Sequence, residues 1–200
     1  MAAATKLLTS GGGGVILTPA SSIASDVTVS IPSVTGTAGI IQNNIITSAT
    51  AVASTSGTSI DFTGIPTGVK RVTVMFNAVS TSGTSLPQIQ LGTSGGVETT
   101  GYVSLVTANN SAISANSTTG ILVNAAGDPG YVVTGIVTIA TLSSNLWVSS
   151  IVTTTDSSSG NYSTTGAGRK TLSGTLARVR LTTVGGTDTF DAGSINILYE

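Results

Sequence analysis

Apolar and polar side chains alternate along much of this chain, and this alternation restricts the possible fold more than any other feature. The clearest runs cover residues 71–76, 178–182 and 194–199, where a large apolar residue occupies every second position. Successive side chains of a strand point to opposite faces, so a period of two predicts strands with one buried face. We therefore expect an all-β protein.

The composition supports this expectation. Of 200 residues, 35 are Thr, 28 are Ser and 25 are Gly, whereas the strong helix formers Glu, Lys, Gln and Leu are sparse. Hydrophobic residues make up 40% of the chain and the net charge is only -1, which is unlike a disordered chain. A chain of this length can bury about 70% of its unfolded surface, enough for one core.

Turn residues divide the alternating runs at short intervals. Residues 131–155 form the clearest hairpin candidate, because two apolar runs flank Leu-Ser-Ser-Asn at 142–145. Other turn signals fall at residues 64–68, 92–96, 127–130, 157–161 and 185–186. Many short strands separated by such turns predict an antiparallel β-sandwich, which we expect to be jelly-roll-like.

The N-terminal part of the chain has a different character. Residues 1–44 include a run of four glycines at 11–14, two prolines and only short β-like pieces at 15–18 and 26–31. We expect an extended N-terminal arm over 1–44 and a β-sandwich domain over 45–200.

An apolar cluster lies where these two parts meet. It comprises Ile40, Ile41, Ile45 and Ile46. One interpretation is the first core strand of the sandwich, and the other is a seam between copies of the protein.

Catalytic, metal and cofactor sites are not predicted. The chain has no Cys and no His, which excludes thiol and histidine-base chemistry and the common zinc sites. Its eight acidic residues are scattered, and no pattern pairs two carboxylates or builds a calcium loop. The glycine run lacks the Gly-Lys-Ser/Thr ending of a phosphate loop. We expect no enzyme activity and no cofactor.

Ligand contact is considered at two aromatic residues. Tyr162 stands in a polar run at 157–166, which suits an exposed contact with a ligand. Trp147 has two interpretations, as a core anchor or as a platform for a sugar, and its alternation with Ser149 and Ile151 favours the core.

The basic residues Arg169, Lys170, Arg178 and Arg180 form the densest group of charges. They are interpreted as a solvated strand face or, alternatively, as a contact for an acidic partner or a sugar acid. Near neutrality overall argues against binding nucleic acid, which requires concentrated Lys and Arg. Residues 1–8 are too short and interrupted for a secretory signal, and no run of about 18 apolar residues predicts membrane insertion.

Three stretches are IDFTGIPTGVKRVTVMF at 60–76, LPQIQLGTSGG at 86–96 and LTTVGGTDTFDAGSINILYE at 181–200. They resemble the distal domain of tail-fibre and related virion proteins of tailed phages. The segment at 14–37 is similar to one common in phage fibre proteins. The resemblance covers about half of the chain and implies a homotrimer with a β-sandwich tip, joined to other virion proteins by its N-terminal arm. A long coiled coil or repetitive shaft is missing from the sequence.

These observations predict a non-enzymatic structural protein of the virion, assembled in the host cytoplasm. A short fibre or spike whose sandwich faces outward is the leading interpretation, with a host glycan or receptor as a further partner. The alternatives are a capsid decoration protein that stabilises the head and a carbohydrate-binding module.

Overall fold

The computed structural model describes residues 5–8, 14–17, 46–109, 112–158 and 160–200. The chain divides into two compact units, residues 1–42 and 43–200. In the first unit, β1 (Thr5–Leu8) and β2 (Gly14–Leu17) form an antiparallel pair. The described residues contain no helix long and apolar enough to cross a membrane.

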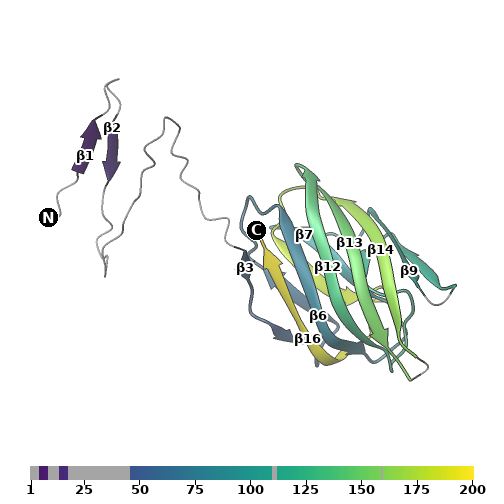
Figure 1. The fold of residues 1–200 in the computed structure, drawn as a ribbon. Helices are drawn as coiled ribbons and strands as arrows, with labels where there is room; N and C mark the ends of the chain where they lie inside the picture. Colours follow the sequence, from purple (N-terminus) through teal and green to yellow (C-terminus); the bar gives the residue numbers. More distant parts are fainter. Residues whose placement is uncertain (1–4, 9–13, 18–45, 110–111, 159) are drawn as a thin grey trace. The chain divides into compact units, whose positions relative to one another are not determined.

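The second unit is a sandwich of two antiparallel sheets (Figure 1). The larger sheet has nine strands in the order β10-β9-β14-β13-β12-β6-β16-β3, with β4 also paired to β16. Their bounds are β3 (Thr47–Ser48), β4 (Val52–Ala53), β6 (Arg71–Thr81), β9 (Tyr102–Ala108), β10 (Ser114–Ser117), β12 (Val132–Ser143), β13 (Leu146–Asp156), β14 (Tyr162–Thr171) and β16 (Phe190–Tyr199).

The smaller sheet has five strands in the order β11-β7-β15-β5, with β8 also paired to β7. Their bounds are β5 (Ser59–Thr63), β7 (Pro87–Thr93), β8 (Gly96–Val97), β11 (Ile121–Leu122) and β15 (Arg178–Thr183). The all-β antiparallel sandwich predicted from the alternation is therefore confirmed.

The strand pairs are nested around one hairpin. β12 pairs with β13, β9 with β14, β7 with β15 and β6 with β16, so partners lie progressively farther apart in sequence. This nesting is the jelly-roll pattern, although three of the four pairs share the larger sheet. The innermost pair is the predicted hairpin, which turns at Ser144 and Asn145 between β12 and β13.

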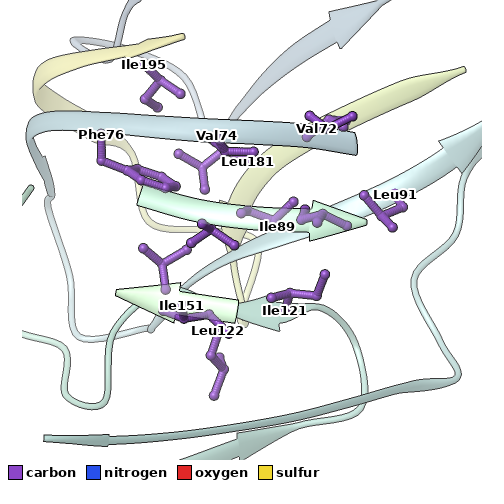
Figure 2. Close-up of a cluster of buried hydrophobic side chains, with 14 of the residues drawn as sticks. Val72, Val74, Phe76, Ile89, Leu91, Ile121, Leu122, Ile151, Leu181 and Ile195 are labelled. Carbon is purple, nitrogen blue, oxygen red and sulfur yellow. The ribbon is translucent and has the colours of Figure 1, made fainter. Parts of the chain in front are cut away.

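The core lies between the two sheets and follows the predicted alternation. In β6, Val72, Val74 and Phe76 are buried, and Ile195 and Ile197 of β16 lie on the same inner face. Figure 2 shows these β6 side chains facing Ile89 and Leu91 of β7 and Leu181 of β15, which come from the opposite sheet. Apolar side chains from both inner faces thus form one continuous core.

Glycine is required where two strands approach closely. Gly135 in β12 has a φ of +147°, and a Cβ there would lie 2.5 Å from the carbonyl oxygen of Val152 in β13. The register between β12 and β6 also shifts between Val133 and Gly135, which marks a β-bulge. A side chain at this position would force the central hairpin apart.

Most predictions for the arm fall outside the described residues, including Ile40, Ile41, Ile45 and the piece at 26–31. Ile46 is described, and it lies just before β3 with 54% of its surface exposed. For Ile46, the interpretation as part of a core strand is therefore wrong. Its place in a seam between copies stays a prediction.

The buried side chain of Ile89 gives a direct test of this core. Ile89→Ala removes apolar atoms from a residue that is 0% exposed, so it should lower the free energy of unfolding by about 2–5 kcal/mol. Chemical denaturation followed by circular dichroism measures this change. Leu142→Ala is the control, because Leu142 is 67% exposed and its loss should change stability by about 0.5 kcal/mol or less. Equal effects of the two substitutions would contradict the inward orientation of Ile89.

Candidate functional site

Polar side chains form rows across the outer face of the smaller sheet. Gln90 in β7 pairs in register with Arg180 in β15, which pairs with Asp61 in β5. Neighbouring strands lie about 4.8 Å apart, so these three side chains stand next to one another. They face away from the core because the residues between them in each strand are turned inward.

A second row lies parallel to the first. Here Gln88 of β7 pairs with Thr182 of β15, which pairs with Ser59 of β5. The intervening inward residues are Ile60, Phe62, Ile89, Leu91, Val179 and Leu181. The strict alternation in three adjacent strands therefore places the core on one side of the sheet and two polar rows on the other.

Loops at the margins turn this face into a groove of about 480 Å³. Its floor carries the two glutamines and Thr182, and its walls include residues 99–100, Thr119 and residues 183–186. Small-molecule sites usually occupy about 300–1,000 Å³, so the groove is large enough to hold a ligand.

The two glutamine side chains are fixed by hydrogen bonds with the wall. Gln88 Oε1 accepts bonds from Ser117 Oγ at 3.2 Å and from Thr119 Oγ1 at 3.0 Å. Gln90 Nε2 donates to the backbone oxygen of Thr119 at 2.9 Å. Gly120 makes room for this arrangement, since a Cβ there would lie 2.6 Å from Gln88 Cδ. The amides are thus held in position without a ligand.

Arg180 and Asp61 form a bidentate ion pair at one side of the groove. Arg180 Nε donates to Asp61 Oδ1 at 2.7 Å, and Nη2 donates to Oδ2 at 2.8 Å. These hydrogen bonds raise the pKa of Arg180, so the guanidinium stays charged. The carboxylate balances that charge, and the row as a whole is neutral.

An ion pair between a buried lysine and a partly buried glutamate holds the wall at residues 99–100. Lys170 Nζ lies 2.6 Å from Glu98 Oε2 and donates to the backbone oxygen of Thr100 at 2.8 Å. It also lies 5.2 Å from the centre of the Tyr102 ring, a distance that permits a cation–π interaction. Lys170 is only 6% exposed, so the interpretation of a solvated strand face is wrong for this residue.

The ionisation of Glu98 reflects this environment. Partial burial acts to raise its pKa, but hydrogen bonds from Lys170 and Ser173 and the charge of Lys170 outweigh burial and lower it. Tyr102 anchors the same loop from below, since its hydroxyl donates to the Glu98 backbone oxygen at 2.9 Å and accepts from Leu91 N at 2.7 Å. Burial raises the pKa of Tyr102 and keeps this donor protonated.

The aromatic residues considered from sequence do not line the groove. Trp147 is 3% exposed and belongs to the core, so its indole ring presents no surface to a sugar. Tyr162 is half-buried and packs edge-on against Tyr131, with ring centres 6.0 Å apart. Burial is the main cause that raises the pKa of Tyr162.

The outer face of the larger sheet has the opposite character. Exposed apolar side chains stand at Val103 and Leu105 in β9, Ile136 in β12 and Val148 and Val152 in β13, and β14 lies between β9 and β13. Between them are mostly Thr, Ser and Ala. We call this surface the flat face, defined by the outward residues of β6, β9, β12, β13, β14 and β16.

Charges are scarce on the flat face. Its charged residues are Arg71 at the start of β6, Asp156 at the end of β13, Arg169 in β14 and the exposed Asp191 near the start of β16. Arg71 Nη2 lies 2.5 Å from Glu200 Oε1. Nowhere in the described ranges do three His, Cys, Asp or Glu side chains gather as a metal site would require.

Comparisons with protein-family models, curated proteins and solved structures find no match to this chain.

The groove was not predicted from the sequence, although one signal was present. Gln88 and Gln90 alternate with Ile89 and Leu91, so they had to share the outer face of a strand. The sequence does not show that β7 pairs with β15, because the two strands lie about 90 residues apart. Without that pairing, the glutamines and Arg180 cannot be recognised as parts of one site.

The pKa of Glu98 leads to a prediction about acid stability. Because that pKa is lower in the folded chain than its ordinary value of 4.5, the ionised carboxylate stabilises the fold above about pH 4.5. This contribution is lost as the pH falls through the folded-state pKa. The free energy of unfolding should therefore differ more between the natural chain and Glu98→Gln at pH 7 than at pH 3, as measured by denaturant titration. A difference that is the same at both pH values would contradict the assignment.

Proposed function

We propose that this chain is a non-enzymatic structural protein of a tailed-phage virion that assembles as a homotrimer through the flat face. The observation that carries the proposal is the combination of exposed apolar side chains and scarce charge on that face. Contiguous apolar surface of this kind is uncommon on monomeric proteins and marks sites of association.

The register of the strands brings the exposed apolar residues into one surface. Val152 of β13 pairs with Ile136 of β12 on one side and with Thr165 of β14 on the other. Leu105 of β9 pairs with Ala167 of β14. These side chains are each about half exposed. A second copy of the chain would cover them together with Arg169, which lies in register between Val103 and Val148 and forms no ion pair among the described residues. The partner would therefore have to supply an acceptor for this guanidinium, because burying an unpaired charge is costly.

The flat face supplies part of an interface between copies. Six strands span five spacings of about 4.8 Å and are about 30 Å long, which gives a surface of roughly 700 Å². Around a threefold axis, each copy would contact one neighbour with the β9 side of the face and the other with the β16 side, so each contact would use roughly 350 Å² of it. One partner in a stable complex buries about 800 Å², so other parts of the chain must add to each contact.

The overall charge favours the same conclusion. With seven basic and eight acidic residues in 200, little electrostatic repulsion keeps copies apart. A single soluble domain usually carries about 25% charged residues, whereas this chain carries 8%. So low a charge content suits identical subunits that pack closely, because they repel one another little.

Residues 1–44 are assigned the role of docking the protein on other virion proteins. They contain few charges, and the resemblance of 14–37 to phage fibre segments supports a shared anchoring role. A short fibre or spike with the sandwich outward is the favoured placement. A decoration protein of the head would use the same assembly face, so the placement is decided by locating the chain on the particle.

Charge placed on the flat face should separate the copies. The double substitution Leu105→Glu with Val152→Glu puts two carboxylates per copy into the contact, so it should convert the trimer to monomer at micromolar concentration. Light scattering coupled to size exclusion measures the mass, and circular dichroism checks that the sandwich remains folded. Val184→Glu, at an exposed apolar position beside the smaller sheet and away from the flat face, should leave the trimer intact. A natural chain that stays monomeric at high concentration would refute the proposal, and a dimer would refute the threefold symmetry.

Removal of the arm tests the docking role separately. Deletion of residues 1–36 should abolish incorporation into particles while leaving the far-ultraviolet circular dichroism and the thermal unfolding of the sandwich unchanged. Incorporation is measured by quantifying the chain in purified particles. If the truncated protein were incorporated normally, docking would not depend on this segment.

A further inference from the structure

We infer that the groove over β5, β7 and β15 is a binding site for a neutral oligosaccharide. This inference concerns the smaller sheet and is independent of assembly through the flat face. It rests on the hydrogen-bonding groups that line the groove, on their charge balance and on the contacts that hold them in place.

The groove presents donors and acceptors that the protein itself leaves open. Gln90 uses Nε2 for Thr119, while no described group donates to its Oε1. Arg180 uses Nε and Nη2 for Asp61, which leaves Nη1 without a partner among the described residues. Thr182 Oγ1 donates to the backbone oxygen of Thr58 at 2.9 Å and keeps its lone pairs available. A ligand rich in hydroxyl groups can both donate to and accept from such a set.

The polar lining also excludes other ligand classes. An apolar molecule would cover Gln90 and Arg180 without replacing their hydrogen bonds to water, which costs free energy for each group. Arg180 is the one charged residue of the described lining, and Asp61 already neutralises it. An anionic ligand would approach the Asp61 carboxylate as well as the guanidinium. The groove therefore favours a neutral, hydroxyl-rich ligand.

Contacts behind the lining keep it in a fixed arrangement. Gln88 is 1% exposed and ties the floor to Ser117 and Thr119, while the ion pair of Lys170 with Glu98 ties the wall at 99–100 to β14. Side chains that are already fixed lose little conformational entropy when a ligand binds. This second layer is what distinguishes a built site from a chance row of surface polar groups.

The residues that line the groove include no aromatic side chain, so recognition depends on hydrogen bonds alone. Each neutral hydrogen bond contributes about 0.5–1.5 kcal/mol, so a single site should bind with a dissociation constant in the millimolar range. If the chain is a trimer as proposed above, three grooves on one particle component would raise the effective affinity through multivalency.

The test uses the full-length protein and two probes. An array of tetra- to hexasaccharides built from hexoses and N-acetylhexosamines, together with uronate-containing counterparts, identifies retained sugars. The best neutral hexasaccharide is then titrated into isotope-labelled protein by nuclear magnetic resonance. We expect retention of neutral sugars, and shifts that map to β7, β15 and residues 99–100 with one site per chain.

Three substitutions connect the binding to the groove. Thr182→Val and Gln90→Leu each remove a ligand-facing polar atom, and each should raise the dissociation constant about two- to twelvefold, as expected for one lost hydrogen bond. Gly120→Ala should also raise the dissociation constant, because the added Cβ would lie 2.6 Å from Gln88 Cδ and so displace the Gln88 side chain. Thr63→Val is the matched control, because Thr63 is an exposed residue of β5 outside the groove lining, and it should not change binding.

Absence of shifts in the groove when neutral oligosaccharide is titrated well above the expected millimolar dissociation constant would overturn the inference. So would an affinity that is unchanged in both Thr182→Val and Gln90→Leu, or a preference for the uronate-containing sugars. The flat-face variant Leu105→Glu with Val152→Glu separates this result from assembly. In that variant, one site per chain should persist with the same single-site affinity, whether or not the natural chain forms a trimer.

Discussion

The register of the antiparallel strands is the constraint on which the rest of this structure depends. Because side chains alternate between the two faces of a strand, a slip of one residue would exchange every inward and outward side chain of that strand. In β15, such a slip would place Arg180 in the core and expose Val179 and Leu181. The burial of these two apolar residues thus selects the pairing that also aligns Arg180 with Gln90 and Asp61.

The same alternation produces two outer faces with different chemistry. On the smaller sheet, the outward positions hold amides, hydroxyls and one neutral ion pair, and loops raise walls around them. On the larger sheet, the outward positions hold mainly Val, Leu, Ile, Thr, Ser and Ala. A concave polar surface suits a small hydroxyl-rich ligand, whereas a flat charge-poor surface suits another protein surface. The division between ligand binding and assembly that we propose follows this difference.

Local pattern was sufficient to predict the strands, the β12–β13 hairpin and the sandwich class, because these depend on neighbours in sequence. It was insufficient where the environment is set by distant residues. Lys170 looked like part of a solvated basic face, but Glu98, 72 residues earlier, pairs with it in a buried position. In β13, Ser149 and Thr153 face inward while Val148 and Val152 face outward, so residue type alone does not identify the buried side. Thr153 tolerates burial because its hydroxyl donates to the backbone oxygen of Val123 at 2.7 Å.

Most of the ion pairs in the described part of the chain lie beside the groove. Among the described residues, three ion pairs occur, and two of them, Lys170 with Glu98 and Arg180 with Asp61, border the groove. An exposed ion pair contributes little to stability, and a hydrophobic replacement of a buried one is often neutral. Stability alone therefore does not explain why a chain with so few charges places them there. Their positions are explained if one pair fixes the wall at residues 99–100 and the other orients the Arg180 guanidinium at the groove. Both roles require a defined geometry, and they do not require a large gain in stability.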